Sequence, residues 1–366
     1  MKILHFAPGL RHGGAAQLAA DLACALQEKE VQNLLVAPDE ARRLIGPRVN
    51  FRPYKPLPLP GKWSSILSLR RSIRKYQPQI LQAYGCEAIG TAVAACRPLP
   101  PGSRPRVVGA LTGYPQRQES ISTAVQEACA AITTISRSLH LELAKLRPTL
   151  ANRATAIPYG VDETLCHPGY RPGAEKNRQW QQRYPELKDS YLLCLPGPIS
   201  AAHGTADIVP ILSTLRHQDI PAHAIIAGDT AAADPEYLAD LRRRLRAAGL
   251  DMHVTWAGAC PDMRDVLCLC DVTLTLTARP AAYDRPILEA LALGRPVVGY
   301  MQGAAGEYLE AFNPEGALPV GNIDAAADVL SQWYGNPPEG AARVPAPYRL
   351  YKDTAQSYLT LYNTLL

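Results

Sequence analysis

Short apolar segments alternate with helix-like segments along the whole chain, in two successive series. The apolar runs cover residues 3–6, 33–36, 80–83, 107–111 and 131–135, then 191–195, 224–227, 254–256, 272–276 and 296–299. Helical patterns between them include residues 15–27, 87–95, 207–215, 235–248, 263–268 and 286–293. Strands joined through helices form parallel sheets with right-handed crossovers. The sequence therefore predicts an α/β protein with two Rossmann-like, doubly wound domains.

The two domains are predicted over residues 1–173 and 174–351. A length of 366 residues fits two domains, and Pro168–Asn177 is rich in Pro, Gly and charge, as linkers are. Residues 352–366 form an amphipathic helical pattern at the end of the chain. Since doubly wound sheets bind ligands beyond the carboxyl ends of their strands, two such domains facing each other are expected to enclose a substrate cleft.

Charge is distributed unevenly between the two halves. Residues 1–173 contain 22 Lys and Arg against 11 Asp and Glu, a net charge of +11, whereas residues 174–366 have a net charge of −6. The densest basic cluster lies in Ser64–Tyr76 and consists of Arg70, Arg71, Arg74 and Lys75. It is either a solvated helix face or a surface that docks on anionic lipid or another polyanion. Nucleic acid is not expected as a partner, because no aromatic residues are interleaved with the basic ones.

Composition excludes several other classes. No run approaches the ~20 apolar residues of a membrane span, and the amino-terminal residues lack the order of a signal peptide. The nine cysteines include no Cys-x-x-Cys, so neither a disulfide framework nor a zinc site is predicted. We therefore expect a cytoplasmic protein, with peripheral attachment to the inner face of the cytoplasmic membrane as one alternative.

A glycine pair follows the first predicted strand. In Pro8–Gly14, the residues Gly13 and Gly14 precede a helix, where backbone amides favour an anion such as phosphate. A plain tight turn explains the same pair. The dinucleotide pattern G-x-G-x-x-G is absent, which disfavours a nicotinamide or flavin enzyme. The neighbouring His12 either contacts acceptor or phosphate, or faces solvent.

The segment Asp271–Pro296 is more specific. A strand leads through an irregular loop to a helix that begins near Pro286 and carries Glu289 among apolar neighbours. A carboxylate in this place can accept hydrogen bonds from two vicinal hydroxyls, as a ribose presents them. Stabilisation of the helix amino terminus is the alternative role of Glu289.

Several short motifs, taken in their order and spacing, resemble the retaining nucleotide-sugar glycosyltransferases of family 4. They are Gly13-Gly14, Ile157–Asp162, Ala227–Asp229, Trp256–Gly258, Cys270–Val272, Leu288–Val298, Met301–Glu307 and the closing helix Gln356–Leu366. Leu-Thr-Gly-Tyr around Thr112 further resembles a branch that builds lipopolysaccharide core or surface polysaccharide.

The resemblance implies a GT-B fold whose closing helix packs back on the first domain. It implies transfer of a hexose from a nucleotide-diphosphate sugar, with UDP-sugar favoured, to a saccharide or glycolipid, with retention at the anomeric carbon. No cofactor is expected, nor any metal, because no Asp-x-Asp occurs. The implied donor-binding residues are Gly13, Gly14, Gly228, His203, Tyr283, Asp284, Arg285, Pro286, Ile287 and Glu289. The implied acceptor-side residues are His12, Thr112, Gly113 and Tyr114.

The sequence departs from the family pattern at the donor side chains. Ala281 stands where the first glutamate of a Glu-x7-Glu pair is expected, and Pro198 and His203 replace the phosphate-binding Arg and Lys. Thr112 replaces a histidine near the acceptor. Arg285 can restore the lost positive charge and Asp284 can reach the sugar, or the two form a surface pair. His203 and Arg285 are the electrostatic candidates for catalysis.

These departures leave two alternatives to the transferase. One is a catalytically impaired GT-B protein that keeps the nucleoside pocket and acts as a binding or assembly partner. The other is a nucleotide-sugar epimerase of the same fold. Product analysis separates the three, since they give a glycoside, no product, or an altered donor.

Overall fold

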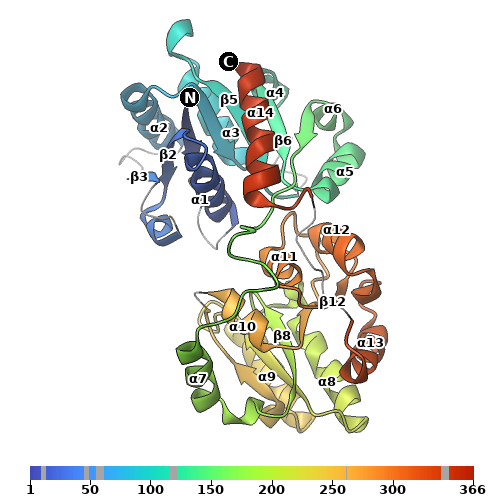
Figure 1. The fold of residues 1–366 in the computed structure, drawn as a ribbon. Helices are drawn as coiled ribbons and strands as arrows, with labels where there is room; N and C mark the ends of the chain where they lie inside the picture. Colours follow the sequence, from blue (N-terminus) through green and yellow to red (C-terminus); the bar gives the residue numbers. More distant parts are fainter. Residues whose placement is uncertain (10–13, 45–48, 55–61, 115–121, 261, 339–345) are drawn as a thin grey trace. The chain divides into compact units, whose positions relative to one another are not determined.

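The computed structural model describes the whole chain except residues 10–13, 45–48, 55–61, 115–121, 261 and 339–345 (Figure 1). The chain divides into two compact units, Met1–Asp162 with Ala346–Leu366, and Glu163–Pro345. The division falls before the expected linker because Tyr170 donates a hydrogen bond to Asp265 of the second unit.

The described part of the first unit contains a seven-stranded parallel sheet in the order β3-β2-β1-β4-β5-β6-β7. Helices cover the sheet, so the central strand β4 is buried along its whole length. The strands are β1 (Lys2–Phe6), β2 (Gln32–Ala37), β3 (Asn50–Pro53), β4 (Ile80–Tyr84), β5 (Arg106–Leu111), β6 (Ala131–Thr134) and β7 (Ala154–Ala156). The helices are α1 (Gly14–Gln27), α2 (Lys62–Tyr76), α3 (Cys86–Cys96), α4 (Thr123–Ala128), α5 (Arg137–Leu146), α6 (Pro148–Ala151) and α14 (Ala355–Leu365).

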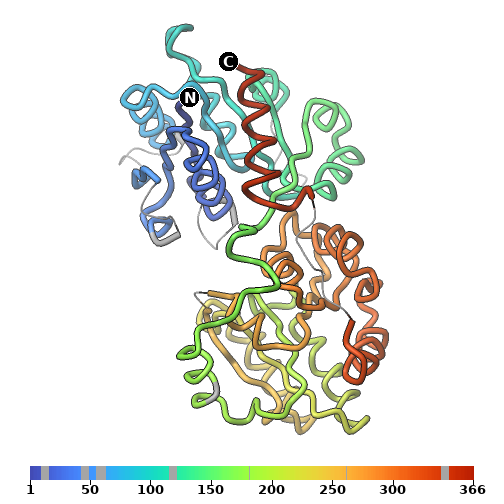
Figure 2. The backbone as a smooth tube through the Cα atoms, viewed as in Figure 1, coloured from blue at the N-terminus to red at the C-terminus, as the bar shows by residue number. Residues whose placement is uncertain are grey.

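Helix α14, at the end of the chain, packs into the first unit (Figure 2). Tyr358 and Tyr362 are fully buried on its inner face. The Tyr362 hydroxyl donates to Gln82 of β4 at 2.9 Å, and the Tyr358 hydroxyl shares a hydrogen bond with Thr133 of β6 at 3.0 Å. Two central strands of the first sheet are thus tied to the last residues of the sequence.

The described part of the second unit repeats the architecture with a six-stranded parallel sheet, in the order β10-β9-β8-β11-β12-β13. Leu193, Leu274 and Val298 lie in its hydrophobic core, beneath flanking helices. The strands are β8 (Tyr191–Pro196), β9 (Ala222–Ala227), β10 (Val254–Trp256), β11 (Val272–Thr275), β12 (Val297–Tyr300) and β13 (Ala317–Leu318). The helices are α7 (Ala174–Arg183), α8 (Ile208–His217), α9 (Pro235–Ala247), α10 (Met263–Leu269), α11 (Arg285–Ala292), α12 (Gly303–Phe312) and α13 (Ile323–Gly335).

In each sheet, later strands are added first on one side of the unit's first strand and then on its other side. This reversal lies between β1 and β4 in the first unit and between β8 and β11 in the second. The helices that follow these neighbouring strands pack on opposite faces of a doubly wound sheet, which opens a ligand-binding crevice at the carboxyl ends. The two-domain α/β fold predicted from the sequence is confirmed.

Helix α2 uses its apolar face within the first unit. Leu69 and Ile73 are almost completely buried, whereas Arg71, Arg74 and Lys75 are exposed. Arg70 is partly buried and donates from Nε to the Ala95 carbonyl of α3 at 3.2 Å. The buried face is therefore not available for insertion into a lipid surface. Within the described residues, no helix combines the length and apolarity needed to span a bilayer.

Replacing Tyr362 with Ala is expected to destabilise the first unit by about 3–5 kcal/mol, because a large core side chain is removed and Gln82 loses a partner. Urea denaturation followed by circular dichroism measures the change. Ser357→Ala, on the exposed side of α14, is the matched control and should leave the midpoint within error. Equal midpoints for the two variants would show that α14 is not part of the cooperative core.

Candidate functional site

The loops at the reversal point of the second sheet are in direct contact. The loop after β8 contains the short helix Ala201–His203 and then Gly204, whose φ is +64°. A Cβ atom at Gly204 would overlap the main-chain oxygen of Leu276, in the loop after β11. Only glycine permits both this backbone conformation and this approach. His203 is therefore fixed beside the loop that leads into α11.

Two further loops join this edge. The Gly228 backbone, after β9, approaches the Gly197 carbonyl so closely that a side chain at Gly228 would overlap it. On the other side, the Ala304 amide of α12 donates to the Ala281 carbonyl at 2.8 Å. The carboxyl edge of the second sheet is thus a continuous set of loops that follow β8, β9, β11 and β12.

His203 lies on the loop after β8 with one ring nitrogen occupied. Its Nδ1 is 2.8 Å from the Ser200 hydroxyl, and desolvation lowers the pKa of His203 below its ordinary value of 6.5. The imidazole is therefore neutral at pH 7. In the tautomer whose Nδ1 accepts from Ser200, Nε2 carries the proton and is a hydrogen-bond donor; in the other tautomer, Nδ1 donates to Ser200 and Nε2 accepts. Pro198 in the same loop is exposed.

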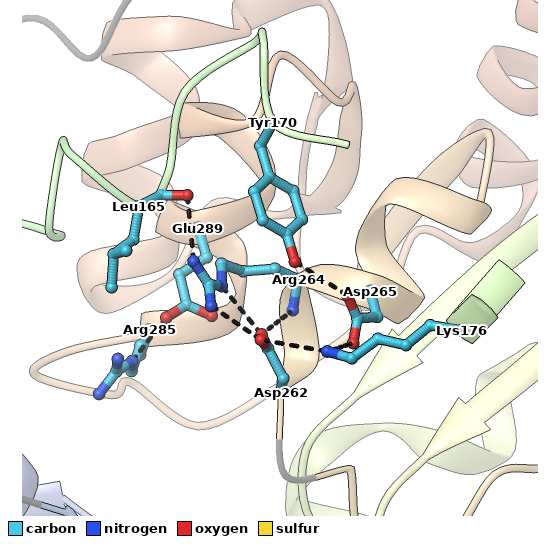
Figure 3. A network of polar contacts seen from close by, with 8 residues as sticks. All are labelled: Leu165, Tyr170, Lys176, Asp262, Arg264, Asp265, Arg285 and Glu289. Atoms are coloured by element: carbon cyan, nitrogen blue, oxygen red, sulfur yellow. Dashed lines mark hydrogen bonds and ion pairs between the residues drawn. The ribbon is translucent and has the colours of Figure 1, made fainter. Parts of the chain in front are cut away.

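Glu289 and Arg285 form an ion pair along α11 (Figure 3). The Arg285 Nε lies 2.6 Å from the Glu289 Oε1, and the side chains are 38% and 8% exposed. The pairing follows from the helix, since residues four apart lie on the same face. The sequence analysis assigned these side chains to different parts of a donor. In the structure they contact each other, so the carboxylate is already charge-compensated.

Asp284 is the residue that precedes α11. Its carboxylate accepts a hydrogen bond from the Thr275 hydroxyl at 3.4 Å. Burial raises the pKa of Asp284 to about 6, although the Ile287 amide and the Thr275 hydroxyl act in the opposite direction. Tyr283 and Pro286 beside it are partly exposed. The Ile287 side chain is only 2% exposed and belongs to the core, so its main chain alone can serve a ligand.

A polar network that the sequence analysis missed lies beside α10 (Figure 3). Arg264 donates from Nε and Nη2 to Asp262, at 2.9 and 2.7 Å, and from Nη1 to the Leu165 carbonyl at 3.3 Å. Asp265 accepts from Tyr170 at 2.9 Å and from Lys176 at 2.6 Å. The network therefore fixes the segment entering the second unit to the start of α10. In the sequence, the only sign of this network is that two acidic residues and an arginine fall within four residues at the start of a predicted helix.

A cavity of about 310 Å³ lies next to this network, between α7 and the loop after β10. Ala257 and Cys260 of that loop line one side, and Trp180 and Tyr184 of α7 line the other. Burial raises the pKa of the Cys260 thiol to about 11, so the thiol is protonated at neutral pH. The cavity therefore combines aromatic and small apolar residues with the charged side chains of Lys176, Arg183, Asp262 and Asp265, and its described lining contains no thiolate at neutral pH.

The candidates from the first half of the sequence lie on the first unit. Gly14 is the first residue of α1, after β1, and Thr112, Gly113 and Tyr114 follow β5. The Thr112 hydroxyl is 3.5 Å from the position a Cβ atom of Gly85 would take. Gly14 and residues 112–114 thus lie at the same, carboxyl edge of the first sheet. His12 and Gly13 lie outside the described residues. Among residues that are described, no group of three His, Cys, Asp or Glu side chains is placed to hold a metal ion.

Two family models match the chain, one to each half. Residues 12–165 match the model described as Glycosyltransferase Family 4, and residues 193–336 match the model described as Glycosyl transferases group 1. No curated protein matches the sequence significantly.

Solved structures match over the whole chain. HepE of Anabaena, in complex with UDP-glucose, has a TM-score of 0.80 at 18% identity, with 99% of this chain and 100% of that chain covered. A glycosyltransferase of Rickettsia africae has a TM-score of 0.79 at 15% identity, with 100% and 98% covered. The lipopolysaccharide outer core galactosyltransferase WaaB, in its apo form, has a TM-score of 0.68 at 11% identity, with 100% and 99% covered. At these identities the likeness establishes the fold.

Asp284→Asn is expected to stabilise the protein at pH 7 and to lose this advantage near pH 4. A folded-state pKa of about 6, against an ordinary 3.8, means that the folded state binds the proton more tightly. Stability therefore falls as pH rises from about 4 to about 6. Since the side chain retains some contact with water, we expect a gain of about 2–4 °C in Tm at pH 7, equivalent to ~1 kcal/mol. Asp251→Asn, at an exposed position, is the control; an identical pH profile for both variants would contradict the assignment.

Proposed function

This chain belongs to the GT-B glycosyltransferases, and we propose that it transfers a hexose from a UDP-sugar to a saccharide or glycolipid with retention of anomeric configuration. The observation that carries the proposal is the reversal point of the second sheet. There the His203 loop contacts the loop that leads to Arg285 and Glu289. Open α/β sheets bind their ligands at this point.

The donor is proposed to lie along this edge with its ribose at Glu289. The carboxylate retains a second oxygen, Oε2, besides the one paired with Arg285, and carboxylate oxygens accept hydrogen bonds from sugar hydroxyls. Arg285 engages Glu289 through Nε, and its guanidinium carries the positive charge that suits phosphate oxygens. Glu289 thus serves the nucleoside while it orients the arginine for the diphosphate.

The proposed reaction breaks the bond between the anomeric carbon and the diphosphate oxygen. The acceptor hydroxyl oxygen forms the new bond on the same face of the sugar, and its proton passes to the departing phosphate. The His203 Nε2–H and the Arg285 guanidinium stabilise the negative charge that develops on the diphosphate. A phosphate dianion would also raise the pKa of His203, against the effect of burial. This scheme needs no metal ion.

Asp284 is proposed to contact the donor sugar in place of the glutamate that Ala281 replaces. It lies one residue before Arg285, and its carboxylate is held by the Thr275 hydroxyl. On the first unit, Thr112, Gly113 and Tyr114 at the carboxyl edge are proposed to serve the acceptor. Gly14, Gly228, Tyr283, Pro286 and the Ile287 main chain are proposed as further donor contacts.

The matched structures support the choice of substrates. HepE was solved with UDP-glucose, and WaaB is named as a galactosyltransferase of the lipopolysaccharide outer core. On this basis we propose a UDP-hexose donor and a role in lipopolysaccharide core or surface polysaccharide synthesis, at the cytoplasmic side of the membrane.

A second candidate function is nucleotide binding without turnover. It is favoured by the Arg285–Glu289 ion pair, in which two donor-binding side chains satisfy each other, and by the loss of the sugar-contacting glutamate at Ala281. Such a protein would bind the nucleoside and act as an assembly partner.

UDP is expected to raise the melting temperature, and GDP and ADP are not. Binding to the native state alone contributes ~2.7 kcal/mol at a hundredfold excess over Kd. Glu289→Gln should weaken UDP binding by about tenfold or more, through the loss of a charge-assisted hydrogen bond. Glu310→Gln, at an exposed position on α12, is the control. A shift with GDP or ADP alone would overturn the choice of uridine.

Arg285→Gln is expected to reduce kcat for sugar transfer by about 100-fold, because it removes charge that stabilises the leaving diphosphate. Proton NMR of the product determines the anomeric configuration. An inverted glycoside would contradict retention, and an altered donor sugar without a glycoside would indicate an epimerase. UDP binding without any product would favour the second candidate function.

A further inference from the structure

The first unit contains a cavity of about 510 Å³ at the amino ends of its strands. Arg106, the first residue of β5, lines it together with Gln79, which directly precedes β4. The Arg106 amide donates to the Gln79 carbonyl at 2.8 Å, so the two strand starts are joined there. Thr112 follows the opposite, carboxyl end of β5. The cavity is therefore separate from the acceptor-side residues of the same unit.

Three arginines from different elements meet at this cavity. Arg74 comes from the last turn of α2, Arg104 from the segment between α3 and β5, and Arg106 from the start of β5. Arg104 is held in place by the main chain, since it donates from Nε to the Leu99 carbonyl at 2.5 Å and from Nη2 to the Arg97 carbonyl at 2.8 Å. These bonds orient the guanidinium without neutralising its charge.

None of the side chains that line the cavity is acidic. Within the described residues, no carboxylate forms an ion pair with Arg74, Arg104 or Arg106. The cavity thus gathers three of the 22 Lys and Arg residues of the basic amino-terminal half. The three like charges repel one another, and an anionic ligand would relieve that repulsion.

The rest of the lining combines the polar residues Gln77, Gln79 and Ser103 with apolar residues. Ile73 and Leu99 are each 2% exposed and pack beneath the cavity. Leu365, the last residue of α14, and Leu366 bound it on another side. A volume of 510 Å³ lies within the range of about 300–1,000 Å³ typical of small-molecule sites. A carboxylate would offset only one of three positive charges, whereas a phosphate ester carries close to two and accepts several guanidinium bonds.

We propose that this cavity binds an organic phosphate, with its phosphate group on Arg74, Arg104 and Arg106 and its organic part on Ile73, Leu99 and the end of α14. The phosphate belongs either to a soluble sugar phosphate or to a lipid headgroup. Both sources present the same group to the three arginines. The site is independent of the proposed donor site, which lies on the second unit.

A calorimetric titration of the full-length protein with glucose 1-phosphate tests whether the phosphate comes from a soluble sugar phosphate. Sedimentation with vesicles of phosphatidylglycerol and phosphatidylcholine, compared with phosphatidylcholine alone, tests the lipid source. Arg74→Gln and Arg106→Gln each remove one charge from the cavity. Arg71→Gln removes the same charge from an exposed position of α2 outside the lining. Arg285→Gln controls for binding at the second unit.

At least one ligand is expected to bind, and Arg74→Gln and Arg106→Gln should each weaken its binding by about tenfold, the loss of one charge-assisted contact. Arg71→Gln should leave the affinity within twofold. A binding signal that only Arg285→Gln removes would belong to the proposed donor site and would count against the cavity. If Arg74→Gln and Arg106→Gln weaken binding of glucose 1-phosphate alone, the ligand is a soluble phosphate. If they weaken binding to anionic vesicles alone, the ligand is a lipid headgroup. Absence of binding in both arms, or equal weakening by Arg71→Gln, would overturn the proposal. Unchanged melting temperatures exclude misfolding as the cause of any loss.

Discussion

Parallel strand pairing is the constraint on which the rest of this structure depends. Parallel sheets are covered by helices on both faces, as the fully buried β4 and β9 show. Their faces therefore offer no room for chemistry. Polar residues and glycines that do not serve the core collect in the loops at the two edges. Both candidate sites of this protein lie at such edges, and neither lies on a face.

The carboxyl edge of the second unit is organised by close backbone contact and by charge balance. Gly204 permits the loop after β8 to touch the loop after β11, which brings the His203 loop against the residue that follows β11. The Arg285–Glu289 pair then places one cation and one anion on the same face of α11. A nucleotide-sugar has the complementary arrangement, with hydroxyls at the ribose and negative charge at the diphosphate. The ion pair is therefore compatible with binding as well as with the resting state.

Features that involve long, regular segments could be predicted from the sequence, whereas features that depend on tertiary contact could not. Apolar runs such as residues 191–195 identified central strands because each is buried along its length. The edge strands β3, β7 and β13 were missed, since two to four residues carry too little periodicity to be distinguished from loops. Helix α7 begins inside the expected linker, and its Lys176 bonds Asp265, which is 89 residues away in sequence. The Arg285–Glu289 pair was within reach of sequence analysis, since the two residues are four apart on a predicted helix.

Part of the basic excess of the amino-terminal half lies on α2 and at the neighbouring cavity. Helix α2 was expected either to be solvated or to dock on a polyanion, and its buried Leu69 and Ile73 show that its apolar face belongs to the core. What remains is a basic surface that continues into the cavity of Arg74, Arg104 and Arg106. An exposed basic surface alone is weakly selective, because solvent and salt screen each charge. A cavity with an apolar floor adds shape to that charge, and shape is what allows one phosphate-bearing molecule to be preferred over another. The amino edge of the first sheet thus has the physical properties of a binding site, and doubly wound folds do not use that edge for their active sites.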